Sequence, residues 1–502
     1  MLKPCSFTDV FVFPARFASL ATLVAAFTAF PALAAQPSAA PAEPRQLAFE
    51  NKPWSGDFDE MLERRRLRVL VPYSRTLYYN DKGHERGITV ELVRDFERYL
   101  NKKHARKLRK RPLTVYIIPV TRDVLIEDVA KGLGDIAAGN LTETGSRLKV
   151  VDFVAPRDRK PVSEVVVTGP ASPAIAHVDD LAGKHFHVRK SSSYYTSLIS
   201  LNNEFRKRRM ARIKLTLVPD ALEDEDLMEM LNAGLVELIA VDDWKARMWA
   251  HVLPKIKVSD IAVAEGGYTG WAIRKGSPKL AEEIKDFYAK IVKTSGVIEY
   301  RAAQQHRRIK LISNNTAGGG WKRLEQMLGL FEKYGTKYHF DPLMLAAQGF
   351  QESRLRQDAR SPVGAIGVMQ IMPATGTELK VGDIRILEPN IHAGAKYMDR
   401  LMTTYFSDAR FNEQNRTLFA LASYNAGPGR IVQLRKLAQK RGLDPDQWFN
   451  NVELVVAEKV GIETTTYVRN IFKYYTAYRL QLEVLAERRK AREKVRPAPG
   501  RN

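Results

Sequence analysis

The chain of 502 residues contains one cysteine, Cys5, and beyond its first residues it has no apolar run long enough to cross a bilayer. Acidic residues are also scarce relative to basic ones, 57 against 79, which gives a formal net charge of +22. Because Cys5 lies in a segment that we expect to be removed, the mature protein can form no disulfide and depends on core packing. With 45% hydrophobic and 27% charged residues, the composition excludes disordered and multispanning proteins.

The N-terminus has the order of a secretory signal. Lys3 and Arg16 precede an apolar run over residues 17–30, and Ala-Leu-Ala-Ala follows at 32–35. This pattern predicts a signal peptide over 1–35, cut after Ala34 or Ala35, and therefore export to the periplasm. An uncleaved membrane anchor is the alternative. Cys5 precedes the apolar run and is badly placed for lipid attachment to a mature N-terminus.

Export changes what the positive charge means. In the cell envelope the abundant polyanions are peptidoglycan carboxylates and membrane headgroups, so we expect these partners and no nucleic acid. Part of the charge lies in a basic tail over 483–502, where a peripheral contact with a membrane competes with a solvated helix end.

The rest of the chain divides by composition. Residues 36–66 begin with an Ala- and Pro-rich stretch and predict a linker. Over 67–308 short apolar runs alternate with amphipathic segments, which predicts an α/β domain with a largely parallel sheet. A polar, glycine-rich linker follows at 309–320, and over 321–482 the periodicity is helical. The expected fold class is multidomain, α/β followed by mainly α.

Five phrases of the first domain resemble the family 3 solute-binding proteins. They are 67–71, 87–92, 132–139, 146–153 and 270–276. The resemblance implies two lobes that close around an amino acid or a stem peptide from the wall, with Arg147 on its carboxylate, Asp243 on its ammonium group and Ser192 or Ser193 contributing hydroxyls. A guanidinium suits a carboxylate well. The alternatives are a surface charge for Arg147 and a helix cap for Asp243.

A candidate acid lies in the second domain. Asp341-Pro342 predicts the start of a helix, and Glu352 comes at its end, just past an apolar face. The negative end of a helix and an apolar wall both favour the protonated carboxyl group, as a general acid requires. Taken alone, a glutamate at a helix end is more often solvated.

Four blocks around Glu352 closely resemble the transglycosylase SLT domain. They are 351–353, 361–373, 422–427 and 463–468, in the order of that family. The resemblance implies a lysozyme-like helical fold in which Glu352 protonates the bond between N-acetylmuramic acid and N-acetylglucosamine. The same carboxylate would then deprotonate the C6 hydroxyl and close a 1,6-anhydro ring, with no water, metal or cofactor. Periplasmic location at the outer membrane is implied as well.

The same blocks supply further site residues. We expect these residues to shape the groove and bind substrate: Ser353, Ser361, Met369, Gln370, Tyr424, Asn425 and Tyr467. We expect Glu463, before a threonine run, to be structural and to orient the site. Two other functions compete with a lytic transglycosylase: a hydrolytic lysozyme, and a non-catalytic receptor that grips glycan strands.

Overall fold

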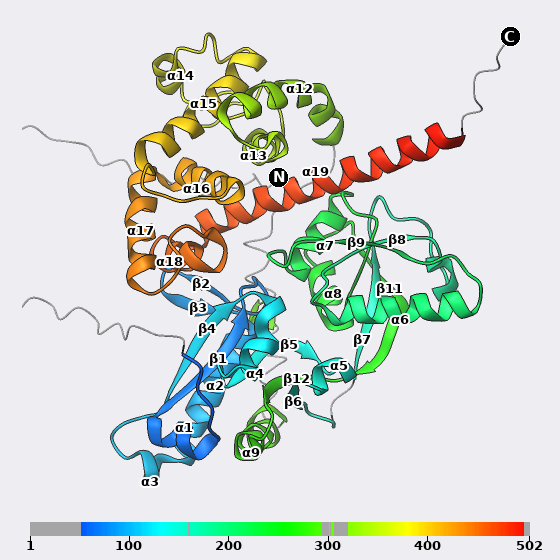
Figure 1. The fold of residues 1–502 in the computed structure, drawn as a ribbon, viewed down its shortest axis with the longest axis vertical. Helices are drawn as coiled ribbons and strands as arrows, with labels where there is room; N and C mark the ends of the chain where they lie inside the picture. Colours follow the sequence, from blue (N-terminus) through cyan, green and yellow to red (C-terminus); the bar gives the residue numbers. More distant parts are fainter. Residues whose placement is uncertain (1–51, 159–160, 294–300, 302, 306–319, 496–502) are drawn as a thin grey trace, which may run out of the picture.

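A computed structural model describes residues 52–158, 161–293, 301, 303–305 and 320–495 (Figure 1). The predicted signal peptide, the first part of the linker at 36–66 and almost all of the linker at 309–320 lie outside these residues. Among the helices of the described ranges, none is both long enough and apolar enough to span a membrane.

The first lobe is built on a mixed sheet with the order β4-β1-β5-β12-β6. Its strands are β1 Arg66–Pro72, β4 Thr114–Val120, β5 Ile136–Thr142, β6 Val151–Val154 and β12 Thr269–Arg274. The apolar strand β1 is buried on both faces: Val69 packs in one core cluster with Phe96, and Leu70 in another with Leu125. These partners lie on α2 (Ile88–Lys103) and α4 (Leu125–Ala130), so helices cover both sides of the sheet.

The second lobe repeats this plan around the order β11-β7-β10-β8-β9. Its strands are β7 Val162–Thr168, β8 His185–Val188, β9 Lys214–Leu217, β10 Leu238–Asp242 and β11 Lys257–Gly267, and its helices are α6 Ser193–Lys207, α7 Asp224–Asn232 and α8 Asp243–Ala250. The α/β prediction is confirmed. Both sheets are mixed, however, because β7 and β12, the strands that follow each crossing between the lobes, pair antiparallel.

The second domain is helical, as predicted. Its helices are α12 Gly320–Tyr338, α13 Pro342–Ser353, α14 Pro373–Leu379, α15 Leu387–Tyr405, α16 Glu413–Ala426, α17 Pro428–Lys440, α18 Glu453–Lys459 and α19 Ile462–Val495. The long helix α19 passes between the other helices and the two-lobed domain (Figure 1). It contacts α13 and α16 on one side and α7 of the second lobe on the other.

Three element boundaries differ from the sequence-based ones. Helix α1 (Phe58–Arg64) lies inside the expected linker 36–66; most of its residues are charged, but Phe58, Met61 and Leu62 are buried against the first lobe. Helix α12 begins at Gly320, the last residue of the second expected linker. Helix α19 continues past residue 482 to Val495, so the first part of the basic tail is helical.

Candidate active site and solute-binding cleft

Helix α13 places Glu352 in its last turn. Asp341 caps the start of this helix by accepting a hydrogen bond of 2.8 Å from the backbone N–H of Leu343, and Pro342 occupies the first helical position. At the other end Arg354 adopts a left-handed conformation, with φ of +60°, and ends the helix. Local sequence therefore fixes where the carboxyl group emerges.

The carboxyl group of Glu352 lies in a protected environment. Glu352 is partly exposed, and the hydroxyl of Tyr467, on α19, donates a hydrogen bond of 2.5 Å to its Oε1. Burial raises the pKa of Glu352 to about 7, against the opposing effect of the Tyr467 hydrogen bond. Desolvation is therefore the stronger influence, and the protonated form persists up to about neutral pH.

A second tyrosine borders the site. Tyr424, on α16, donates a hydrogen bond of 2.7 Å to the carbonyl oxygen of Met369. Burial and then the charge of Glu352 raise the pKa of Tyr424 well above its usual range, and the same two effects act on Tyr467. Both phenols are therefore neutral hydrogen-bond donors at any physiological pH.

The loop between α13 and α14 is held by buried polar groups. Asn390, fully buried on α15, accepts a hydrogen bond of 2.8 Å from the N–H of Met369 and donates one of 2.8 Å to the carbonyl oxygen of Ile366. Gly367 has φ of +76°, and a Cβ at this position would lie 2.6 Å from Nδ2 of Asn390. The close approach of loop and helix thus requires glycine.

Two residues that we expected to contact substrate make their contacts within the protein instead. The side chain of Met369 is fully buried in the core and packs against Gly394, which corrects the expectation that it lines the groove. Ser353 is buried, and its hydroxyl donates 2.9 Å to the carbonyl oxygen of Val368, so it supports the loop. Both side chains therefore make their contacts within the protein and not in an open groove.

The remaining expected residues lie at different depths. Gln370 is partly exposed and has φ of +49°, a left-handed conformation that costs energy outside glycine. Ser361 accepts a hydrogen bond of 2.9 Å from the N–H of Ala365 within the loop turn. Asn425 is exposed and accepts a hydrogen bond of 2.8 Å from the hydroxyl of Thr464.

The orienting role expected for Glu463 stays a prediction. It lies in the first turn of α19 with an exposed side chain, where the positive end of the helix stabilises an acid. Within the described part of the chain, no hydrogen bond or ion pair joins it to the residues around Glu352. Asn390 and Thr464 are the polar residues that support the site and that sequence reasoning missed, since nothing in a single sequence separates a buried asparagine from a solvated one.

The solute-binding cleft is closed by contacts between the two lobes. Arg122 in the first lobe pairs with Glu223 in the second at 2.7 Å, and Asn140 donates 2.5 Å to Asp242. The cavity left between them holds about 10 Å³, roughly the space of one water molecule. An amino acid therefore requires the lobes to separate.

Arg147 and the serines do lie in this cleft. The guanidinium of Arg147 donates to the carbonyl oxygens of Thr142 at 2.7 Å and Ser191 at 3.0 Å, and burial followed by the charge of Arg122 lowers the pKa of Arg147 to about 10. Ser192 and Ser193 line the same cavity, although the Ser192 hydroxyl also caps α6.

Of the two adjacent acids, Asp242 and not Asp243 bonds to the other lobe, while Asp224 is the acid that lines the cavity itself. Asp242 is 1% exposed, and burial raises its pKa, whereas Asp243 starts α8 and is partly exposed. Strand β10 continues one residue further than its apolar run, so the inward-facing position falls on Asp242, and the ammonium contact of Asp243 stays a prediction.

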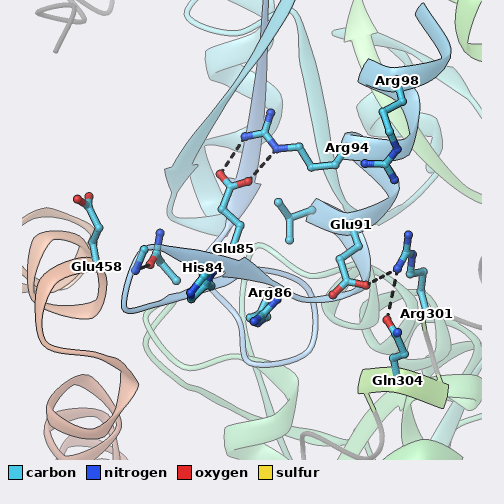
Figure 2. Close-up of a pocket in the computed structure, with 12 residues that line it drawn as sticks. His84, Glu85, Arg86, Glu91, Arg94, Arg98, Arg301, Gln304 and Glu458 are labelled. Atoms are coloured by element: carbon cyan, nitrogen blue, oxygen red, sulfur yellow. Dashed lines mark hydrogen bonds and ion pairs between the residues drawn. The ribbon is translucent and has the colours of Figure 1, made fainter. Parts of the chain in front are cut away.

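A second, larger cavity of about 660 Å³ lies where the first lobe meets α18 (Figure 2). It is bordered by the hairpin of β2 (Tyr79–Asp81) and β3 (His84–Arg86), by α2 and by Glu458. Its arginines are mostly matched: Arg94 pairs with Glu85 at 2.8 Å and Arg301 with Glu91 at 3.1 Å. Among the described residues, no group of three or more His, Cys, Asp or Glu side chains could hold a metal ion.

The chain matches two protein families and a set of relatives. The family of bacterial extracellular solute-binding proteins, family 3, matches residues 67–300, and the transglycosylase SLT domain matches 329–447. A protein of Pseudomonas fluorescens named membrane-bound lytic murein transglycosylase F is 27% identical over 432 residues, which cover 82% of this chain and 84% of that protein. A protein of the same name from Desulfosudis oleivorans is 27% identical over 436 residues, 81% of this chain and 88% of its own length.

Among solved structures, an amino acid ABC transporter substrate-binding protein of Streptococcus pneumoniae bound to L-arginine matches with a TM-score of 0.41 and 19% identity, over 50% of this chain and 98% of its own. The chain thus joins a family 3 solute-binding domain to a transglycosylase SLT domain, and over 82% of its length it is homologous to proteins named membrane-bound lytic murein transglycosylase F.

Proposed function

We propose that this chain is a lytic transglycosylase that cleaves the glycan strands of peptidoglycan without water, with Glu352 as its catalytic acid and base. The observation that carries the proposal is the protected carboxyl group of Glu352, whose pKa burial raises to about 7. A general acid is most effective when its pKa lies near the working pH. The names of the relatives and the SLT match give the substrate class.

One carboxyl group performs both proton transfers. Protonated Glu352 donates its proton to the oxygen between N-acetylmuramic acid and N-acetylglucosamine, and the bond from C1 to that oxygen breaks. The ionised carboxylate then takes the proton of the C6 hydroxyl of the same muramic acid, whose oxygen bonds to C1 and closes the 1,6-anhydro ring. Glu352 ends protonated, and no water is consumed. Ordinary glycosidases need a second carboxylate, which either activates the attacking water or forms a covalent intermediate with the sugar.

The environment of Glu352 fits this use of a single acid. Among the described residues, the groups that shift its pKa are the surrounding protein and Tyr467, and no second carboxylate contributes. The Tyr467 hydroxyl stabilises the ionised form after the first transfer. Gln370, partly exposed and held in a left-handed conformation, and the exposed Asn425 present polar groups to the sugars, while Ser361 and Tyr424 hold the loop.

The two-lobed domain acts as a sensor for an amino acid or a stem peptide. Arg147 is a partly buried cation whose hydrogen-bond acceptors are two backbone carbonyl oxygens, so a ligand carboxylate gives it a direct ionic partner in addition to the nearby charges of Glu164 and Asp242. The buried carboxyl group of Asp242 suits the ligand ammonium. Entry of such a ligand exchanges the contacts between the lobes, Arg122 with Glu223 and Asn140 with Asp242, for contacts with the ligand.

The same proposal includes location and domain limits. The enzyme is exported and its signal peptide is cleaved. Its basic C-terminus holds it peripherally at the outer membrane, from which it reaches the peptidoglycan of the periplasm. The proposed limits are residues 67–308 for the sensor and 321–482 for the transglycosylase, with α1 packed against the first lobe and α19 extending beyond the second limit.

The deciding experiment is mass spectrometry of purified sacculi digested by the full-length mature protein. The proposal expects muropeptides that end in 1,6-anhydromuramic acid, and a loss of at least ~100-fold in their release by Glu352→Gln. Glu332→Gln, an exposed acid on α12, is the matched control and keeps wild-type activity. Reducing muramic acid ends would identify a hydrolytic lysozyme, and no release of muropeptides by the wild type would leave a receptor that grips glycan. Unchanged turnover by Glu352→Gln would remove Glu352 from the reaction.

A further inference from the structure

The helix that carries Tyr467 begins without a cap of its own. The first four N–H groups of a helix have no partner inside the helix, and the residue just before it commonly supplies a side-chain oxygen. Helix α19 begins at Ile462, and the residue before it is Gly461, which has φ of +116° and no side chain. A side-chain cap for the start of α19 must therefore come from another part of the chain.

That part is the tip of the β2–β3 hairpin in the solute-binding domain. Oδ1 of Asp81 accepts a hydrogen bond of 3.1 Å from the N–H of Ile462, 381 residues later in the chain. Next to it, the N–H of Lys82 donates 3.0 Å to the carbonyl oxygen of Ala457 near the end of α18. The hairpin tip thus provides hydrogen-bond partners for the end of α18 and for the start of α19, both in the catalytic domain.

The elbow between α18 and α19 is shaped for this contact. A Cβ at Gly461 would lie 3.0 Å from Oδ1 of Asp81 and 3.1 Å from Cε of Lys82. A side chain there would crowd the ends of the Asp81 and Lys82 side chains. Glycine is therefore required both by the left-handed φ and by the approach of the neighbouring domain.

The first two turns of α19 connect this contact to the active site. Tyr467 is five residues after Ile462, about 7.5 Å along the helix axis. Between them, the hydroxyl of Thr464 donates to Asn425 at 2.8 Å, and the hydroxyl of Thr465 lies 3.3 Å from that of Tyr73 at the end of β1. Movement of the helix start would move the Tyr467 hydroxyl relative to Glu352.

We propose that Asp81 is a positioning residue for the transglycosylase reaction: the solute-binding domain supplies the N-terminal cap of α19 and so holds the hydroxyl of Tyr467 on the carboxylate of Glu352. This inference rests on the proposed function. It assigns to the hairpin tip a role that does not require a bound solute.

The test compares full-length Asp81→Ala, Asp81→Asn and His84→Ala. Alanine removes the cap, whereas asparagine caps about as well as aspartate. His84 lies two residues beyond the tip, borders the large cavity (Figure 2), and its side chain makes no hydrogen bond or ion pair within the described residues. We expect the rate of anhydromuropeptide release to fall roughly fivefold in Asp81→Ala, the fold-change that corresponds to the loss of a typical helix cap. In Asp81→Asn and His84→Ala the rate should stay near that of the wild type.

The pH profile separates positioning from general stability. Two titratable side chains face Glu352, Tyr467 on α19 and Tyr424 on α16. Because the Tyr467 hydrogen bond lowers the pKa of Glu352, its loss should move the alkaline limb of activity to higher pH in Asp81→Ala, as in Tyr467→Phe. Gly461→Ala crowds the Asp81 side chain from the other side and should reproduce both effects, and Asp81→Asn should reproduce neither.

Two results would overturn the inference. One is an Asp81→Ala protein with the wild-type rate and profile. The other is a slower Asp81→Ala protein with an unmoved alkaline limb and a lower melting temperature, which would make the contact merely structural. If the wild-type protein releases no anhydromuropeptides, the proposed function itself fails and the inference falls with it; an active wild type with an indifferent Asp81 rejects the inference alone.

Discussion

The hydroxyl of Tyr467 donates a hydrogen bond of 2.5 Å to a carboxylate oxygen of Glu352, which lies 115 residues earlier in the chain. This bond favours the ionised carboxylate, while burial favours the protonated form, and burial prevails because the pKa of Glu352 lies near 7. The two residues thus set how readily the acid gives up and recovers its proton, and this balance can be tested directly.

Tyr467→Phe should lower the rate and move the alkaline limb of the pH profile upward. The variant loses a hydrogen bond to a charged group, which is worth about a factor of ten in rate. The pKa of Glu352 rises further once that bond is gone, and a general acid then stays protonated to higher pH. Initial rates of sacculus lysis against pH measure both effects. Tyr405→Phe, at an exposed tyrosine on α15, is the control, and a limb that moves to lower pH would contradict the role of the hydroxyl.

Glu352→Gln should stabilise the protein at neutral pH and above. In the folded protein the pKa is near 7, against about 4.5 in the unfolded chain, so the folded state binds more protons between these values and the wild type loses stability as pH rises through this window. The cost reaches about 3 kcal/mol above pH 7. Glutamine removes the ionisation, so the advantage of the variant in urea unfolding should grow from pH 4 to pH 8. Equal advantages at the two pH values would show that Glu352 is not desolvated.

Gly367→Ala should be much more damaging than Gly364→Ala. Both glycines have positive φ, but a Cβ at Gly367 would lie 2.6 Å from the Asn390 amide, whereas a Cβ at Gly364 would have nothing within 4 Å. The first variant adds overpacking of about 1–3 kcal/mol to the backbone strain that both share. Thermal unfolding and lysis rates of the two variants give the comparison. Equal losses of stability and activity would mean that the Asn390 side chain moves aside for the added methyl group.

Glu229→Gln should destabilise the interface between the domains. Glu229 in α7 is buried and pairs with Arg75 of the first lobe at 2.9 Å and with Lys473 of α19. Removing one partner of a buried ion pair typically costs about 3 kcal/mol or more, because the remaining charge is left uncompensated. Urea unfolding measures this loss. Glu204→Gln, at an exposed acid on α6, should have no measurable effect.

Arg147→Ala should abolish binding of small peptides and amino acids by the solute-binding cleft. Calorimetry with a panel of amino acids and short peptides carrying free carboxylates should give binding to the wild type and at least ~10-fold weaker binding to the variant. Arg147→Lys should also bind weakly, since an ammonium group cannot reproduce the bidentate fork. Arg206→Ala, at an exposed arginine, is the control. Equal affinities in the wild type and Arg147→Ala would place the ligand elsewhere.

Sequence reasoning was strongest where local chemistry decides the structure. The Asp341-Pro342 start of α13, the α/β first domain and the helical second domain all follow from caps and periodicity. It failed where burial depends on distant contacts. Nothing local shows that Met369 faces the core, that Asn390 holds a loop, or that α1 has an apolar face covered by the first lobe.

The choice between Asp242 and Asp243 shows the same limit. A strand that continues one residue further moves the inward-facing acid by one position, and only the pairing of Asp242 with Glu164 on β7 fixes that end. The contact of Asp81 with Ile462 spans 381 residues and could not be read from either segment alone.

Helix α19 serves as part of the interior for both domains, because Lys473 and Arg469 on it are buried against the second lobe and against Glu453. A transglycosylase excised from this chain would therefore bring charged side chains to its surface and lose neighbours that its own sequence cannot replace. Replacing either domain by an unrelated one would therefore require matching substitutions along that helix.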